Sequence, residues 1–172
     1  GHRMIGLEDV VFAVALLVSF AAQAQNQEEV KLSYREIGSI LPPMRVIDSA
    51  KQEYTENAFK DNNHFFMFLF NPTCGHCIQM AKLVGDHVEE FKKSDILFLA
   101  GPAMQPYMTS FYQASGIGKH PRIKVGVDSA GTVDRLYNYK TLPQINIYDK
   151  KRRLVKIFYG DTPLDTIRKL IP

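Results

Sequence analysis

The sequence predicts an α/β fold in which a mixed β-sheet carries helices on both faces. Two near-continuous apolar runs of strand length, His64–Phe70 and 95–100, are typical of strands buried on both sides in a parallel sheet. Helix-like segments alternate with these strands, which favours parallel pairing through crossover connections. The last two strands, Gln144–Tyr148 and Leu154–Tyr159, are joined by a tight turn and therefore predict an antiparallel hairpin.

Local patterns place the other elements. Residues 44–48 follow Pro42-Pro43 and alternate like a strand, and the apolar positions after Cys77 recur with helical spacing. Asp161-Thr162-Pro163 supplies a polar cap and a first-turn proline for a final helix. The further expected elements are a helical turn at 55–62, helices at 104–115, 129–137 and 164–171, and a strand at Ile123–Asp128.

Composition limits the classes of protein to which the chain can belong. The 172 residues are 45% hydrophobic, which is enough for one core that does not depend on disulfides. The formal net charge of +3 is too small to indicate nucleic-acid binding, and the basic run 150–153 lies between two strands as a solvated turn. We expect one domain over 34–172, preceded by a polar linker over 25–33.

The N-terminal segment reads as a targeting signal. The 13 residues from Val10 to Ala22 are apolar or small except for Ser19, which is too short for a membrane span and suits the apolar region of a signal peptide. Ala22-Gln23-Ala24 provides a cleavage site, so we expect residues 1–24 to be removed; residues 1–3, before Met4, could be left over from cloning. A membrane anchor and a soluble helix are the alternatives. The expected location is periplasmic or otherwise exported.

The two cysteines of the chain, Cys74 and Cys77, form a CxxC pair at the junction of a buried strand and a helix. The helix N-terminus favours a thiolate at Cys74, and Cys77 lies one turn further in. This difference predicts that Cys74 attacks and that Cys77 resolves the mixed disulfide. Gly75 leaves room for a partner, and His76, the only charged group that we place beside the pair, would stabilise the thiolate. We therefore expect a pair less reducing than that of thioredoxin, with no cofactor besides its own disulfide.

Other uses of a CxxC pair fit less well. A structural zinc site needs four ligands, whereas the chain has one cysteine pair and its other histidines, His64, His87 and His120, are scattered. A purely structural disulfide is also possible, although it would usually join more distant segments, because a loop this short gains little entropy.

Several motifs together resemble the thioredoxin fold. They are Cys74-Gly75-His76-Cys77 at a strand-to-helix junction and Leu142-Pro143 before a hairpin. Three further features resemble the TlpA/ResA-like (AhpC/TSA-redoxin) branch: Leu41-Pro42-Pro43, a long segment before Ile123–Asp128, and the run 125–160. The resemblance implies a thioredoxin-like three-layer α/β/α sandwich with a TlpA-type insert. Asn71 stands where the similar peroxiredoxins have a threonine, which disfavours peroxide reduction.

The resemblance also implies roles for residues outside the cysteine pair. Pro143 would be a cis proline beside the cysteines, and the backbone of Leu142 would pair with a substrate peptide. Pro72 and Thr73, just before Cys74, would also contact substrate. The chain departs from the family pattern in three places: Thr73 replaces a common tryptophan, Phe68 replaces a buried acid, and Gln144 replaces a common threonine.

The expected function is an exported thiol–disulfide oxidoreductase. The family resemblance favours reduction of cysteine-containing exported proteins, with electrons from an upstream thiol donor. The CGHC sequence also resembles disulfide isomerases, so oxidation or isomerisation is an alternative. A non-catalytic binding module on the same scaffold is another. We expect no nucleic acid and no metal, and a membrane contact only if the N-terminal segment stays attached.

Overall fold

A computed structural model describes residues 19, 21–25, 34–59, 62–137 and 141–172. Within these residues, one sheet is built from β1 (Arg45–Asp48), β2 (Glu53–Thr55), β3 (His64–Phe70), β4 (Ser94–Ala100), β5 (Ile123–Asp128), β6 (Gln144–Tyr148) and β7 (Leu154–Tyr159). The helices are α2 (Gly75–Asp86), α3 (Met108–Ser115), α4 (Thr132–Tyr137) and α5 (Leu164–Arg168). Short 3₁₀ helices are η1 (Glu56–Phe59), η2 (Val88–Phe91), η3 (Pro102–Tyr107) and η4 (Ile117–Lys119).

The strands lie in the order β2-β1-β5-β4-β3-β6-β7. The central strands β3, β4 and β5 are parallel, whereas β6 runs antiparallel to β3 and forms an antiparallel hairpin with β7. Toward the opposite edge of the sheet, β1 is antiparallel to both β5 and β2. The predicted mixed sheet and terminal hairpin are therefore confirmed.

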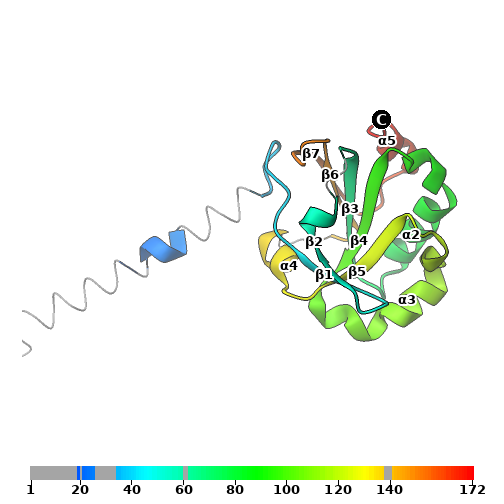
Figure 1. Cartoon of the computed structure of the whole chain (residues 1–172), viewed down its shortest axis with the longest axis horizontal. Helices are drawn as coiled ribbons and strands as arrows, with labels where there is room; N and C mark the ends of the chain where they lie inside the picture. Colours follow the sequence, from blue (N-terminus) through cyan, green and yellow to red (C-terminus); the bar gives the residue numbers. More distant parts are fainter. Residues whose placement is uncertain (1–18, 20, 26–33, 60–61, 138–140) are drawn as a thin grey trace, which may run out of the picture.

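The central strand β3 contributes to two apolar layers, which explains its continuous apolar sequence. Phe66, Phe68 and Phe70 pack with residues of α2, α3 and α5 on one face. The alternate residues, such as Phe65 and Met67, pack with α4 and η1 on the other face. Figure 1 shows α2 and α3 on one side of the strands and α4 on the other. The predicted three-layer α/β/α arrangement is confirmed.

Several boundaries differ from the sequence prediction. Strand β2 was not predicted, because it is only three residues long. The helix expected at 104–115 is divided into η3 and α3, since Pro106 has no N–H to donate to an α-helical bond. The polar cap expected from Asp161 and Thr162 is wrong: Pro163 precedes the first residue of α5, and no side chain caps the helix.

The segment before β1 lies along the start of β7. The N–H of Gly38 donates to the carbonyl of Leu154 at 2.7 Å, and the N–H of Leu154 donates to Ser39 at 2.8 Å. A further bond joins the N–H of Leu41 to the carbonyl of Arg152 at 3.0 Å. Backbone pairing therefore extends beyond β7 at this end of the sheet.

Most of the expected targeting segment and linker lies outside the described residues. Of residues 1–33 the structure describes Ser19 and residues 21–25, which are helical. Across the part of the chain that is described, no helix has both the length and the apolar character needed to span a membrane.

Candidate functional site

The end of β3 delivers the cysteine pair to the start of α2. After Phe70 the chain turns at Asn71, whose side-chain oxygen accepts hydrogen bonds from the N–H and the hydroxyl of Thr73, both at 2.9 Å. The N–H of Cys74 donates to the carbonyl of Asn71 at 3.0 Å. Cys74 is the residue that precedes α2, in an extended conformation, and its carbonyl accepts the N–H of Ile78 at 3.0 Å. This turn fixes Cys74 at the helix N-terminus.

The two thiols differ in exposure in the predicted sense. Cys74 is half-buried, whereas Cys77 is fully buried on the face of α2 that packs against β3. Burial raises the pKa of the Cys77 thiol to about 12. A backbone hydrogen bond from Asn71 lowers this pKa, whereas the neighbouring Cys74 and the Asp161 carboxylate raise it further. A thiol that stays protonated and out of solvent suits a second step better than a first attack.

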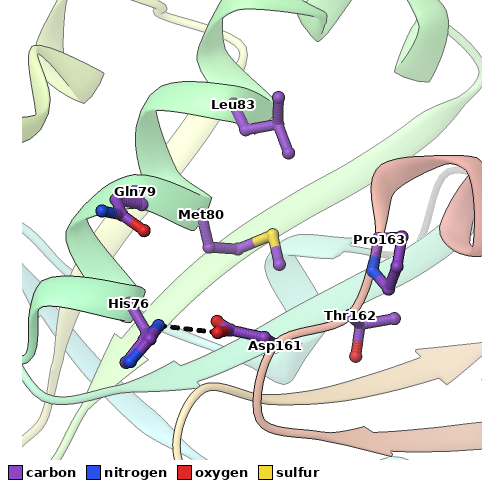
Figure 2. Close-up of a pocket in the computed structure, with 7 residues that line it drawn as sticks. All are labelled: His76, Gln79, Met80, Leu83, Asp161, Thr162 and Pro163. Carbon is purple, nitrogen blue, oxygen red and sulfur yellow. Dashed lines mark ion pairs between the residues drawn. The ribbon is translucent and has the colours of Figure 1, made fainter.

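An ion pair stands beside the cysteines. His76 Nδ1 lies 2.7 Å from Asp161 Oδ2, and the two side chains are 63% and 67% exposed. Figure 2 shows the imidazole at the start of α2 pointing toward the carboxylate on the loop between β7 and α5. The expectation that His76 is the only charged group beside the cysteines is therefore wrong, since sequence reasoning assigned Asp161 to a helix cap.

The Leu142–Pro143 segment lies at the same end of the sheet as the cysteine turn. The Leu142–Pro143 peptide bond is cis, as the sequence resemblance implied. Gln144 pairs with Leu69, so the residue before Gln144 lies level with the last residue of β3, just ahead of the cysteine turn. The N–H of Gly160 donates to the carbonyl of Pro143 at 2.8 Å. Three segments distant in sequence thus meet at one place: the CGHC turn, Leu142–Pro143, and the loop that starts at Gly160.

A pocket of about 350 Å³ opens between α2 and this loop. Met80 and Leu83 form an apolar wall on the helix, and Pro163 faces them from the loop, as Figure 2 shows. The complete lining is His76, Gln79, Met80, Leu83, Asp161, Thr162 and Pro163. The ion pair is therefore part of the rim of an open cavity beside the cysteines.

No protein-family model matches the chain, and no curated protein matches it. Solved structures match over most of its length. The thioredoxin domain of a thiol–disulfide oxidoreductase from Bacteroides vulgatus has a TM-score of 0.64 and 17% identity, over 80% of this chain and 99% of that chain. The chain has a thioredoxin fold.

Two further structures with the thioredoxin fold are similar to the chain. A secreted disulfide oxidoreductase from Mycobacterium tuberculosis, homologous to E. coli DsbE, has a TM-score of 0.61 and 12% identity, over 74% of this chain and 92% of that chain. An exposed lipoprotein thioredoxin from Streptococcus pneumoniae has a TM-score of 0.60 and 17% identity, over 76% and 98%. At these identities the similarity establishes the fold.

Within the thioredoxin fold, the other predicted site residues lie close to the cysteine turn. Gly75 and Thr73 are exposed, and a Cβ added at Gly75 would meet no atom within 4 Å. Packing therefore does not require a glycine at position 75. The space beside Gly75 is open, so a partner could approach there. Leu142 is half-buried, whereas Pro72 and Pro143 are buried. Contact of these residues with a substrate stays a prediction.

The centre of the thioredoxin fold is aromatic beneath the cysteine pair. Phe68 stacks on Phe98 with ring centroids 4.5 Å apart and planes nearly parallel, at 3°. The resemblance would place a buried acid at this position, and the stacked pair occupies that space instead. In the part of the chain that the structure describes, no group of three or more histidine, cysteine, aspartate or glutamate side chains could hold a metal ion.

Proposed function

We propose that the chain is an exported thiol–disulfide oxidoreductase of the TlpA/ResA type, which reduces disulfides in partner proteins through Cys74 and Cys77. The observation that carries the proposal is the unequal pair itself: a half-buried thiol at a helix N-terminus and a buried thiol one turn later. The thioredoxin-fold oxidoreductases similar to the chain support the same reading.

The reaction needs two exchange steps. The Cys74 thiolate attacks one sulfur of the partner disulfide, forms a mixed disulfide and releases the other partner sulfur as a thiolate, which takes up a proton. Cys77 then loses its proton and attacks the Cys74 sulfur. This forms the Cys74–Cys77 disulfide and releases the second partner thiol. The partner gains two electrons and two protons in total, and a dithiol donor must then reduce the oxidised pair.

The partner peptide would lie along the Leu142–Pro143 segment. This segment meets the cysteine turn at the end of the sheet, so an extended peptide could pair with the backbone of Leu142 while Cys74 reaches its disulfide. Thr73 and Gly75 flank Cys74 on the exposed side and leave room for that peptide.

Reductase activity is tested by the reduction of insulin with dithiothreitol as donor. The wild-type chain should accelerate precipitation of the insulin B chain, and Cys74→Ala should abolish the acceleration. Incubated with insulin in the absence of dithiothreitol, reduced Cys77→Ala should accumulate a mixed disulfide, visible on a non-reducing gel and lost on addition of reductant. Cys74→Ala is the matched control and should trap nothing. A chain that neither reduces insulin nor traps a partner would instead be a non-catalytic binding module.

The alternative direction, oxidation or isomerisation, is favoured by the CGHC sequence. Two refolding assays distinguish it. With glutathione disulfide as the oxidant, an oxidase would form native disulfides in a reduced test protein, and an isomerase would restore the native pairing in a test protein whose disulfides are scrambled. A reductase would accelerate neither. Export is tested separately in cells, because cleavage after Ala24 should yield a mature chain that begins at Gln25. An intact N-terminus in the exported fraction would support a membrane anchor instead.

A further inference from the structure

The carboxylate of Asp161 stands at the cysteine site without an evident role in holding the fold. It contacts His76 at 2.7 Å, but both side chains are about two-thirds exposed, so solvent screens the pair and little stability comes from it. Asp161 also does not cap α5, which begins after Pro163 without any side-chain capping bond.

The backbone holds this carboxylate in place. Gly160, directly before Asp161, has a positive φ of 69° and donates its N–H to the carbonyl of Pro143. Directly after it, Thr162 is buried and its hydroxyl lies 3.4 Å from the carbonyl of Gly160. Asp161 is therefore presented toward the first turn of α2 by a loop anchored to the Leu142–Pro143 segment.

The negative charge of Asp161 acts in the opposite sense to a protonated His76. A cationic imidazole next to Cys74 stabilises the thiolate, and hence the reduced form, which makes the disulfide more oxidising. A carboxylate 2.7 Å from the imidazole offsets that charge, and its own negative charge disfavours a thiolate nearby. Its influence extends to the Cys77 thiol: burial raises the pKa of Cys77 most, Cys74 adds to the rise, and Asp161 makes a smaller contribution in the same direction.

We propose that Asp161 is a positioning residue that sets the reduction potential of the Cys74–Cys77 couple. It holds the His76 ring, offsets the charge that the ring carries when protonated and disfavours a nearby thiolate, and so keeps the couple more reducing than a CGHC pair with an unpaired histidine. The expectation of a pair less reducing than that of thioredoxin counted His76 alone, and Asp161 acts in the opposite direction. This inference rests on the proposed redox function and specifies the direction in which Asp161 shifts the reduction potential of the cysteine pair.

The test is equilibration of the purified full-length chain with glutathione at pH 7. One Cys74–Cys77 dithiol and one glutathione disulfide exchange to one Cys74–Cys77 disulfide and two glutathione thiols. Asp161→Asn should shift this equilibrium toward the Cys74–Cys77 dithiol by about three- to tenfold, which corresponds to a rise in potential of about 15 to 30 mV. Asp161→Glu, which retains the charge, should stay within about twofold of the wild type.

Two controls separate this effect from a loss of charge elsewhere or a loss of folding. Asp165→Asn removes a carboxylate from the nearby helix α5, where it pairs with Arg168, and should leave the equilibrium within about twofold. In a His76→Asn background the effect of Asp161→Asn should shrink, because part of it passes through the imidazole. A cooperative unfolding transition shows that a variant is folded. If Asp161→Asn does not fold, Asp161→Ser replaces it in the test.

The outcomes distinguish this inference from the proposed function. A wild-type chain that does not equilibrate with glutathione overturns the redox function itself. A wild-type chain that does equilibrate, while Asp161→Asn lies within about twofold of it or Asp165→Asn shifts as much, overturns the role of Asp161 alone.

Discussion

The two ends of the helical segment that begins with α2 both contact the C-terminal part of the chain, but in different ways. At the N-terminal end, one exposed ion pair joins His76 to the loop before α5. Beyond the C-terminal end, Glu90 accepts a hydrogen bond from Arg168 Nη2 at 2.7 Å and also contacts His87 at 2.9 Å. Arg168 is bound in addition by Asp165.

This difference indicates that the N-terminal end of the segment serves reactivity and that the C-terminal end serves stability. The network around Arg168 joins α5 to η2 and to His87, just after α2, through several charge-assisted bonds, which are stronger than a single exposed pair. Among the described residues, the other end has one charge pair, and the Cys74 sulfur is left partly exposed. We therefore expect changes at the N-terminal end to alter reactivity and changes at the C-terminal end to alter stability.

The largest expected effect is on activity at the N-terminal end. Cys74→Ser should reduce insulin reduction by at least about 100-fold, because a hydroxyl cannot replace the attacking thiolate. Glu90→Gln, at the other end of the segment, should retain the wild-type rate. If both variants lose activity together, the separation of the two ends does not hold.

The next effect is a loss of stability in alkali that depends on Cys77. The pKa of this thiol is raised from an ordinary value of 9.0 to about 12 in the folded state, chiefly by burial. Its contribution is therefore complete below pH 9 and is lost as the pH rises toward 12, because the unfolded chain releases the proton first. At about 1.4 kcal/mol per pKa unit, reduced wild-type protein should lose about 2–4 kcal/mol more than Cys77→Ala over this range.

Urea unfolding of the two reduced proteins at several alkaline pH values measures this difference. Both retain the buried tyrosines, so the titration of those groups is common to the two curves. Parallel decreases in the two unfolding free energies would show that Cys77 does not titrate as predicted.

A smaller effect is expected at the Arg168 network. Arg168→Ala removes the partner of Glu90 and Asp165 and should lower the midpoint of urea unfolding. His76→Asn should lower it by clearly less, because its pair is more exposed. Equal midpoints for these two variants would mean that the network contributes no more than the single pair.

The smallest expected effect is in acid and again concerns the C-terminal end. Hydrogen bonds from Arg168 lower the pKa of Glu90 to about 2, from an ordinary value of 4.5. The stability from this carboxyl is therefore present above pH 4.5 and is lost as the pH falls toward 2. Glu90→Gln should show a shallower loss of thermal stability across this range, and an unchanged slope would contradict the assignment.

The sequence predicted the elements whose signals are local. Strand β3 could be recognised because it is buried on both faces, and α2 because its apolar positions recur at helical spacing. Strand β6 alternates in sequence, but both of its faces are buried; Gln144 is covered and its side-chain amide donates to Asn146 at 2.8 Å. Alternation thus predicted the strand but not the burial of its polar side chains.

The cysteine pair was also predictable, because its spacing and its place after a buried strand lie within one short stretch. The position of Asp161 beside this pair was not, because it depends on a contact with His76, which is far away in sequence. An aspartate two residues before a proline has the local pattern of a helix cap, and no periodicity marks an ion pair across the fold. The sequence does contain one indication of this placement: Gly160 directly follows β7, where the chain must turn toward the cysteines.

The backbone bonds that residues 38–41 make to the start of β7 also bear on solubility. An uncovered edge strand presents free N–H and C=O groups on which a second chain can form a β-ladder. Gly38, Ser39 and Leu41 occupy such groups at Arg152 and Leu154, so this part of the edge is closed within the molecule. Shortening the chain past Leu41 would remove that cover, and the shortened protein should associate edge to edge at concentrations where the longer chain stays dispersed.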